Sequence, residues 1–395
     1  MIWVAVLAWA IFGAWVFAAL STLRALAHQK PLVRLDDSEL KRADAPLVSI
    51  IVPCRNEAGR VLRASIGSML AQDYGNFEII AVNDRSTDET GDVLRALAAA
   101  EARLQVVEGE EPPPGWIGKP YALEQARRRA RGEWVLATDA DMIFAPEALR
   151  EAVAHARKNG YDALSFVPRV DCLTFWERLF MPVFGWAVMM RLPLDRVNDS
   201  RRKEAIAAGG FFLLRREALE RVGGYNAVRA EVAEDLRLAE LLKRGGARFR
   251  LEYAPHLVRT RMQTNLRGIW EGFSKNLFAG VGFRPFWGAF NVLLVYLLAV
   301  APALVTIVVP LLIGINGAWR AIWVAFGGAW LIQTMIFVCV NRFSGIPTIY
   351  APAAPLGFAL FGAILLNSTL RIASGRGVTW KGRKLYAGIT PPRAD

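Results

Sequence analysis

The stretch that decides the fold of this chain is Glu133-Trp134-Val135-Leu136-Ala137-Thr138-Asp139-Ala140-Asp141. Its first part is a short apolar run that is typical of a buried strand. Two carboxylates, two residues apart, come directly after that run and can face one crevice. Ligands of open α/β sheets bind outside the carboxyl ends of the strands. Two hard oxygen ligands there suit Mg²⁺ or Mn²⁺ held together with a substrate's phosphates. The structural alternative is a solvated Asx turn with a helix cap at Asp141.

Strand and helix patterns alternate around this stretch, between residues 46 and 255. The expected strands are Leu47–Pro53, Phe77–Val82, Leu104–Val107 and Trp134–Ala137. The helical patterns between them lie near residues 60–71, 87–100 and 119–131. Such alternation predicts an α/β fold, Rossmann-like, in which helices cover both faces of a mostly parallel sheet.

The composition places this α/β region between membrane segments. Of 395 residues, 54% are hydrophobic and 21% are charged, and the two kinds are segregated along the chain. Residues 2–23 carry no charge, and residues 285–370 carry only two arginines. We therefore expect the following order: an N-terminal transmembrane helix in 1–30, a connector in 31–45, an α/β domain in 46–284, a transmembrane block in 285–370 and a basic tail in 371–395. The block has room for three spans, at about 288–313, 318–340 and 349–370.

The net charge of +12 could indicate nucleic acid, but its distribution favours a membrane. Cations crowd after the first and the last apolar segments, and we find no nucleic-acid motif. The positive-inside tendency puts the end of the first span, and the α/β domain, in the cytoplasm. Three further spans would then leave the basic tail outside. We therefore expect one re-entrant or interfacial segment, in the Pro-rich stretch 345–356, and a cytoplasmic tail. Residues 175–192 are apolar and aromatic with charged ends, which favours an interfacial helix; a buried core helix is the alternative.

Two further polar motifs follow expected strands. Pro53 ends the first strand, and Arg55, Asn56 and Glu57 lie in the loop after it, where a nucleobase and a ribose can bind. A plain strand-to-helix turn is the alternative. Asp84 ends the second strand and can bind the base or the ribose edge. Ser86 and Thr87, just after it, are expected to cap the next helix.

Three motifs point to phosphate and to proton transfer. Lys119 opens a helix, where the helix dipole does not favour a cation, so neutralising a diphosphate is the better reason for its position. A surface loop with one solvated lysine is the alternative. Gly209-Gly210 lets the backbone approach a ligand closely, or packs a tight turn. Glu231, Glu234 and Asp235 open a helix; dipole-favoured acids are one explanation, and a general base for an acceptor hydroxyl is the other.

The last motif precedes the membrane block. Gln263, Arg267 and Trp270 lie in a segment whose arginine and tryptophan could close over a diphosphate and an acceptor. An amphipathic helix at the bilayer surface is the alternative.

The order of these signals resembles the inverting family 2 glycosyltransferases, which have a GT-A fold, over roughly residues 47–275. The resemblance implies that Asp84 contacts the nucleotide, that Asp139 and Asp141 bind the diphosphate and a metal, and that Asp235 is the base. Gly115-Trp116 with Gly118-Lys119, and Trp380-Lys381-Gly382-Arg383, resemble a narrower group. This group is the carotenoid- and hopanoid-associated membrane glycosyltransferases, which are related more loosely to ceramide glucosyltransferase.

One departure from the family narrows the expected activity. Polysaccharide synthases and ceramide glucosyltransferases of the family carry Gln (or Arg)-x-x-Arg-Trp, whereas Gln263, Arg267 and Trp270 have a different spacing. The resemblance thus implies metal-dependent transfer of one sugar, with UDP-glucose as the expected donor, to a membrane lipid. The alternatives are a polyprenyl-phosphate sugar transferase, a processive polysaccharide synthase and, from another class, an inactive lipid-binding scaffold. We expect an integral protein of a bacterial inner membrane.

Overall fold

The computed structural model describes residues 2–34, 45–59, 61–312, 314–315 and 317–386. The chain forms two compact units. One, here called the α/β unit, comprises Gln29–Asp171 and Leu192–Met262. The other, the helical unit, comprises Met1–His28, Cys172–Arg191 and Gln263–Asp395. Most of the expected connector, residues 35–44, lies outside the described residues, as do residues 387–395 of the expected tail.

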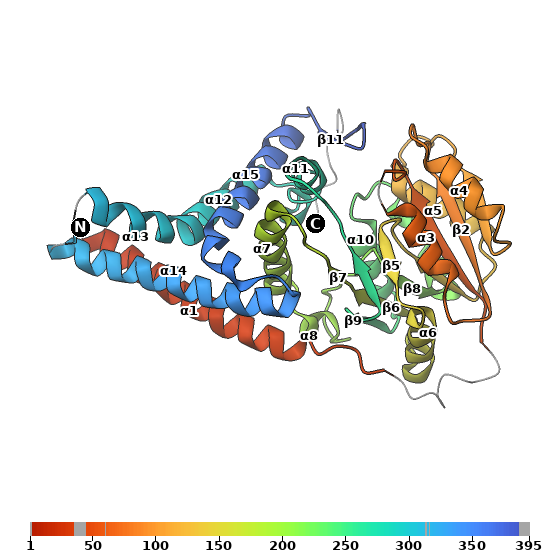
Figure 1. Cartoon of the computed structure of the whole chain (residues 1–395), viewed down its shortest axis with the longest axis horizontal. Coiled ribbons are helices and arrows are strands. Elements are labelled where there is room, and N and C mark those ends of the chain that lie inside the picture. Colours follow the sequence, from red (N-terminus) through yellow and green to blue (C-terminus); the bar gives the residue numbers. More distant parts are fainter. Residues whose placement is uncertain (1, 35–44, 60, 313, 316, 387–395) are drawn as a thin grey trace. The chain divides into compact units, whose positions relative to one another are not determined.

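The α/β unit is built on a seven-stranded sheet in the order β3-β2-β1-β4-β8-β6-β9. Figure 1 labels β2, β8, β6 and β9 of this sheet. Strands β1 to β4 are parallel, β8 is antiparallel to both of its neighbours, and β9 is parallel to β6. The bounds are β1 Val48–Cys54, β2 Phe77–Asn83, β3 Leu104–Glu108, β4 Trp134–Ala137, β6 Ala163–Val167, β8 Phe212–Arg215 and β9 Phe249–Tyr253. The mostly parallel sheet and the four strands expected from the sequence are confirmed.

Helices cover both faces of this sheet because successive strand residues point to opposite sides. Ile50 faces a core shared with α3 and α6, whereas Ile51 faces a core shared with α5 and α10. The helices of this unit are α3 Leu62–Leu70, α4 Thr90–Ala98, α5 Gly118–Arg129, α6 Ala148–Asn159, α8 Leu194–Val197, α9 Arg216–Arg221, η1 Gly224–Val228 and α10 Glu234–Arg244. The central strands are buried on both faces, so helices on both sides are needed and the unit has three layers.

A second, three-stranded sheet begins immediately after the Asp139–Asp141 stretch. It has the order β5-β10-β7, with β5 Met142–Phe144, β10 Val258–Thr260 and β7 Arg169–Val170. In the main sheet the chain order reverses between β1 and β4, which are parallel neighbours. Their carboxyl ends therefore form the switch point at which open α/β sheets bind ligands.

The helical unit contains four helices that are long and apolar enough to cross a membrane, counted over the described residues. They are Ile2–His28, Pro285–Leu312, Trp319–Ser344 and Thr348–Ala373. The elements of this unit are α1 Ile2–His28, α7 Phe175–Arg191, α11 Leu266–Ser274, η2 Ala279–Val281, α12 Pro285–Val295, the π-helical η3 Tyr296–Val300, α13 Ala301–Leu312, α14 Gly317–Ser344, η4 Thr348–Ala353, α15 Ala354–Ala373, β11 Val378–Trp380 and β12 Arg383–Leu385. Each expected span corresponds to one of these four helices.

The boundary between the units differs from the one expected at residue 284. Helices α7 and α11 group with the membrane-type helices. The reason is close packing: a Cβ on Gly357 of α15 would meet the Leu179 carbonyl oxygen of α7 at 2.5 Å. Residues 175–191 are helical as expected, and their interfacial position stays a prediction.

Candidate active site

The candidate site is built at the switch point, on the loops that follow β1, β2 and β4. The loops after β1 and β2 are joined by hydrogen bonds. Arg55 Nη1 donates to the carbonyl oxygens of Asp84 and Arg85, both at 2.8 Å. Asn56, which has a φ of 49°, accepts the Thr87 N–H at 2.9 Å. Asp84 is 5% exposed, and Arg85 lies 3.1 Å from its carboxylate. The structure therefore brings together the expected nucleotide-binding residues, with Pro53 on β1 and Glu57 buried beside Thr90.

The expected capping of α4 by Ser86 and Thr87 is wrong. The Thr90 N–H, in the first turn of α4, is instead accepted by Asp88 Oδ1 at 3.0 Å. Ser86 Oγ accepts the Asn56 N–H at 3.2 Å. Because Asp88 offers a charged acceptor one residue closer to the helix, the other two side chains are left to fasten the β1 loop.

Lys119 connects two acidic motifs that lie far apart in the sequence. Its Nζ is 2.8 Å from Asp139 Oδ1 and 2.6 Å from Glu234 Oε1. Lys119 comes from the start of α5, Asp139 from the loop after β4 and Glu234 from the first turn of α10. The structure thus joins, through one ammonium group, residues that the sequence assigned separately to diphosphate binding and to catalysis.

Electrostatics keep this group charged. Burial lowers the pKa of Lys119, but the charges of Asp139, Glu234 and Asp235 outweigh burial and raise this pKa well above the ordinary value. The side chain of Glu234 is only 3% exposed. Burial raises the pKa of Glu234 above its ordinary value, against the opposing effect of Lys119. Lys119 is therefore a permanent positive charge beside Asp139.

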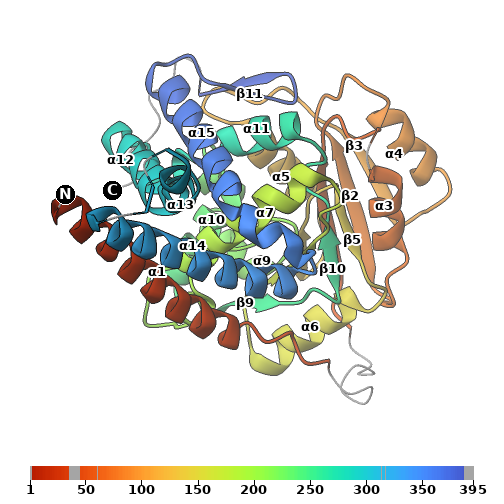
Figure 2. The ribbon, with the colours of Figure 1, turned by 60° about the vertical axis from the view of Figure 1, so that its left-hand side comes forward.

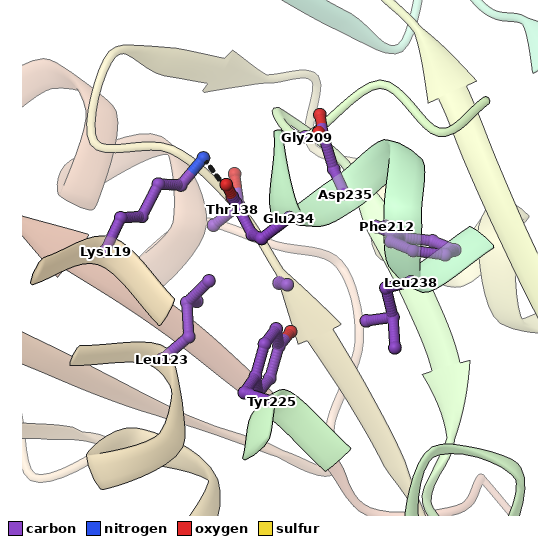
Figure 3. Close-up of a pocket in the computed structure, with 10 residues that line it drawn as sticks. Lys119, Leu123, Thr138, Gly209, Phe212, Tyr225, Glu234, Asp235 and Leu238 are labelled. Atoms are coloured by element: carbon purple, nitrogen blue, oxygen red, sulfur yellow. Dashed lines mark ion pairs between the residues drawn. The ribbon is translucent and has the colours of Figure 1, made fainter. Parts of the chain in front are cut away.

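Glu234 and Asp235 point to different partners (Figure 3). Glu234 reaches Lys119, whereas Asp235 points toward Gly209. A Cβ on Gly209 would lie 2.6 Å from Asp235 Oδ2, so only glycine permits this approach. Asp235 Oδ1 accepts the Leu236 N–H at 2.8 Å, and the residue is partly exposed. Gly210 is likewise packed by the chain itself, because a Cβ there would clash with the Met142 sulfur.

These residues line a small pocket that sequence reasoning found only in part. Lys119, Gly209, Glu234 and Asp235 were expected; the other lining residues are Leu123, Ala137, Thr138, Phe212, Tyr225 and Leu238. Thr138 Oγ1 donates to the Gly210 carbonyl at 2.6 Å and thereby fastens the β4 loop to the glycine pair. Glu231, expected in the acidic cluster, is not among the lining residues.

Tyr225 is the lining residue with the most unusual environment. It is 1% exposed, and its hydroxyl has no hydrogen-bond partner among the described residues. Burial and the charge of Glu234 raise the pKa of this phenol far above its ordinary value. The pair Gly223-Gly224, with φ of 89° and 60°, sets the turn that delivers Tyr225, and this pair was the available sequence signal.

Asp139 and Asp141 have the chemistry required for a divalent metal held together with phosphates. No group of three or more His, Cys, Asp or Glu is placed to hold a metal within the described residues. Mg²⁺ is commonly bound through one or two carboxylates plus substrate phosphates rather than by an all-protein cage. A pair of carboxylates beside a lysine therefore fits a metal that arrives with its nucleotide.

Arg267 and Trp270 belong to α11 in the helical unit, whereas the pocket residues all belong to the α/β unit. The Arg267 side chain is 89% exposed and pairs with Glu271 at 2.8 Å. Its role over the diphosphate stays a prediction.

Comparison with known proteins agrees with this geometry. Residues 49–223 match the family model described as glycosyl transferase family 2. The chain carries a family 2 glycosyltransferase domain. A mannosyltransferase from Pyrobaculum calidifontis, solved in complex with GDP-Man and Mn²⁺, is 22% identical, with a TM-score of 0.55 over 93% of this chain and 98% of that one. This likeness supports the GT-A fold of the family 2 domain.

Two curated relatives share part of the chain. A beta-monoglucosyldiacylglycerol synthase from Synechocystis is 28% identical over 57% of this chain and 46% of its own length. A 4,4'-diaponeurosporenoate glycosyltransferase from Staphylococcus aureus is 26% identical over 60% of this chain and 62% of its own. The match thus spans about half to three fifths of these relatives.

Proposed function

We propose that this protein transfers a single sugar from a nucleotide-sugar to a membrane lipid, with inversion at the anomeric carbon. We take UDP-glucose as the donor and a hydroxyl or carboxyl group of the lipid as the acceptor. The observation that carries the proposal is the continuous set Asp139, Lys119 and Glu234, with Asp235 next to Glu234 on α10. This set supports a site that handles a diphosphate on one side and an acceptor proton on the other.

On the donor side, Asp139 and Asp141 would hold Mg²⁺ or Mn²⁺, which supplies positive charge to the leaving diphosphate. Lys119 adds a second, fixed positive charge next to Asp139. Charge placed in advance where negative charge develops is usually the largest single contribution to such a reaction. Pro53, Arg55, Asn56, Glu57 and Asp84 would bind the nucleoside, and the turn at Gly209-Gly210 would adjoin the sugar.

On the acceptor side, Asp235 would act as the general base. Its carboxylate takes the proton of the acceptor oxygen as that oxygen forms a bond to the anomeric carbon. The bond between this carbon and the diphosphate oxygen breaks in the same step, and the electron pair leaves with the nucleotide. Glu234 holds Lys119 and is buried, so we assign it the positioning role and leave the proton to the more exposed Asp235.

Several observations favour a lipid acceptor. Four apolar helices flank or follow the family 2 domain. The curated relatives bear names of lipid glycosylation: a glucosyldiacylglycerol synthase and a diaponeurosporenoate glycosyltransferase. We therefore place the protein in a bacterial inner membrane with the α/β unit in the cytoplasm, and we assign α7, Arg267 and Trp270 to presenting the lipid to the donor.

Mass spectrometry of membrane lipids tests the proposal. Cells that express the wild-type chain should contain a lipid with one added hexose, and this lipid should be missing from cells that express Asp141→Asn. The matched control is Asp92→Asn, which changes an exposed carboxylate of α4. A polymer on the lipid, or an unchanged lipid profile in both strains, would contradict single-sugar transfer.

Turnover by the purified protein separates the acceptor classes. With UDP-glucose and extracted lipids, Asp235→Asn should abolish transfer while UDP binding stays unchanged. An acceptor phosphate needs no base, so full activity of Asp235→Asn would favour a polyprenyl-phosphate transferase. Absence of nucleotide binding in calorimetry would favour an inactive scaffold.

A further inference from the structure

We propose that η4 and α15 form a re-entrant hairpin rather than a fourth membrane span, so that the basic β11–β12 hairpin returns to the side of the membrane at which the chain enters the α/β unit. The proposal concerns the helical unit alone and does not depend on the enzymatic activity. It rests on which residues of neighbouring helices lie at the same level.

Helices α1 and α14 lie side by side and run in the same direction (Figures 1 and 2). A Cβ on Gly328 would meet the Phe12 ring at 2.8 Å. Further along, Trp186 of α7 stacks on Trp15 and also contacts Phe337. Residue numbers rise together in the two helices, so they run parallel. Ser344 therefore lies toward the same end of the bundle as His28, after which the chain continues into the α/β unit.

The segment Pro285–Leu312 runs in the opposite direction to α14. Trp323 Nε1 donates to the Thr306 carbonyl at 2.9 Å, and Gln333 Nε2 donates to the Ala299 carbonyl at 3.2 Å. Residue numbers rise in one helix as they fall in the other, so α13 is antiparallel to α14. The start of α12, at Pro285, therefore also lies toward the His28 end.

After Ser344 the chain turns back along α14. Trp330 Nε1 donates to the Pro352 carbonyl at 3.1 Å. Trp330 lies fourteen residues before Ser344, which is about 21 Å at the α-helical rise. The chain has thus turned back to the middle of the bundle by residue 352. Phe358 then packs on Phe337, which lies closer to the His28 end.

Helix α15 then runs back along α12. A Cβ on Gly362 would meet the Tyr296 ring at 2.8 Å, and a Cβ on Gly288 would meet Thr369 Oγ1 at 2.6 Å. Helix α15 therefore ends beside the start of α12. Both ends of the segment 345–373 lie toward the same end of the bundle, as a re-entrant hairpin requires and a span does not.

Side chains of α14 hydrogen-bond the backbone carbonyls at the turning point. Irregular backbone at membrane depth is tolerated only where protein groups satisfy it. Here Trp330 binds the Pro352 carbonyl, and Asn341 Nδ2 donates to the Pro347 carbonyl at 3.5 Å. Ala351 and Ala354 are 0% and 3% exposed. These hydrogen bonds satisfy two carbonyls of the Pro-rich stretch from within the protein.

The returning chain is fastened to α11. Ser368 Oγ donates to the Ser274 carbonyl at 2.5 Å, and Asn367 Nδ2 donates to Ser274 Oγ at 3.0 Å. The Lys275 ammonium lies 4.9 Å from the centre of the Trp380 ring. A Cβ on Gly272 would meet that ring at 3.1 Å. The β11–β12 hairpin and the end of α15 therefore brace α11, the helix that carries Arg267 and Trp270.

Cysteine labelling in the full-length protein tests the sidedness. In a background with Cys54, Cys172 and Cys339 replaced, Ser374→Cys follows α15 and Ile315→Cys lies between α13 and α14. A membrane-impermeant maleimide should label Ile315→Cys in intact spheroplasts and Ser374→Cys only in inside-out vesicles. Labelling of Ser374→Cys and Ile315→Cys from the same side of the membrane would overturn the proposal.

A nitroxide at Leu356→Cys tests the depth and separates a re-entrant hairpin from a helix that lies on the surface. Leu356 is 50% exposed and close to the turning point. In proteoliposomes, this label should collide more with oxygen than with a water-soluble nickel chelate, and a label at Ser374→Cys should show the reverse. Equal chelate accessibility at both positions would refute the re-entrant course.

Discussion

The ammonium of Lys119 and the buried carboxylate of Glu234 lie 2.6 Å apart, although 115 positions (234 minus 119) separate them in the chain. The pair fixes the start of α5 against the start of α10. Because Lys119 also reaches Asp139, this ion pair links the start of α10 to a residue proposed to hold the diphosphate.

Replacement of Lys119 should therefore affect both rate and stability. We expect Lys119→Met to lower kcat by about 10²–10³-fold, as loss of one preorganised charge does in other enzymes. The variant also leaves Glu234 buried without its cation. A cycle with Glu234→Gln should show a coupling of about 1–3 kcal/mol in unfolding experiments in detergent.

The control for this cycle is Lys158→Met, which removes an exposed lysine of α6. It should change neither quantity. Wild-type turnover in Lys119→Met would exclude Lys119 from the diphosphate site, and additive effects of the two single changes would show that the ion pair carries no coupling.

Glycine at position 209 should be required for activity rather than for folding alone. In Gly209→Ala the new methyl group would stand 2.6 Å from Asp235 Oδ2, so the carboxylate must move. We expect transfer to fall at least tenfold while UDP binding stays within about twofold, a difference of less than ~0.5 kcal/mol. Gly67→Ala in α3 is the matched control because, outside the local helix backbone, no atom would lie within 4 Å of the new Cβ. Equal activity of the two variants would contradict an active role of Asp235.

The sequence predicted the sheet well because buried parallel strands leave a local signal. Trp134–Ala137 is apolar throughout, and its bounds are confirmed. The site was predicted as separate motifs, and their joining by Lys119 was not, because an ion pair between α5 and α10 leaves no local pattern. Tyr225 was missed because Gly223-Gly224 signals only a turn, whereas the core cluster in which Tyr225 is buried includes Phe212 and Leu238 from other elements.

For the helical unit, the sequence predicted the spans but not how they are arranged. Apolar length identified every candidate span, but helix direction and depth depend on contacts such as that between Trp330 and Pro352. For the same reason, the expected boundary at 284 differs from the observed grouping of α7 and α11 with the membrane-type helices. Side-chain packing between distant segments decides both, and composition cannot report it.

Metal dependence should be visible in nucleotide binding as well as in turnover. We expect Mn²⁺ to tighten UDP binding to the wild-type protein by at least tenfold, which is ~1.4 kcal/mol. Asp141→Asn should lose this increment and keep the metal-free affinity, because Lys119 still attracts the diphosphate. Isothermal calorimetry with and without Mn²⁺ measures both quantities. An increment that survives in Asp141→Asn, as it should in the control Asp92→Asn, would remove Asp141 from the metal site.

Glu78 gives the α/β unit a pH-dependent stability away from the site. Its carboxylate accepts Ser49 Oγ at 2.7 Å and the Arg131 N–H at 2.8 Å, and it pairs with the Arg131 guanidinium at 2.7 Å. Burial raises the pKa of Glu78, but these hydrogen bonds outweigh burial and hold the pKa below its ordinary value of 4.5. A carboxyl with a lowered folded pKa contributes stability above its unfolded pKa, and this contribution is lost as the pH falls through the folded value.

We therefore expect Glu78→Gln to lower the apparent Tm in detergent by a few degrees at pH 7, as loss of about 1 kcal/mol does for a domain of this size. The difference from wild type should persist down to about pH 4.5 and shrink below it, because the wild-type carboxyl then becomes neutral in both states. Glu101→Gln is the control, since Glu101 is 42% exposed and lies 3.6 Å from Arg103. A surface pair of this kind contributes little, so its Tm should match wild type at every pH. A Glu78→Gln difference that grows as the pH falls would show that the carboxylate destabilises the fold.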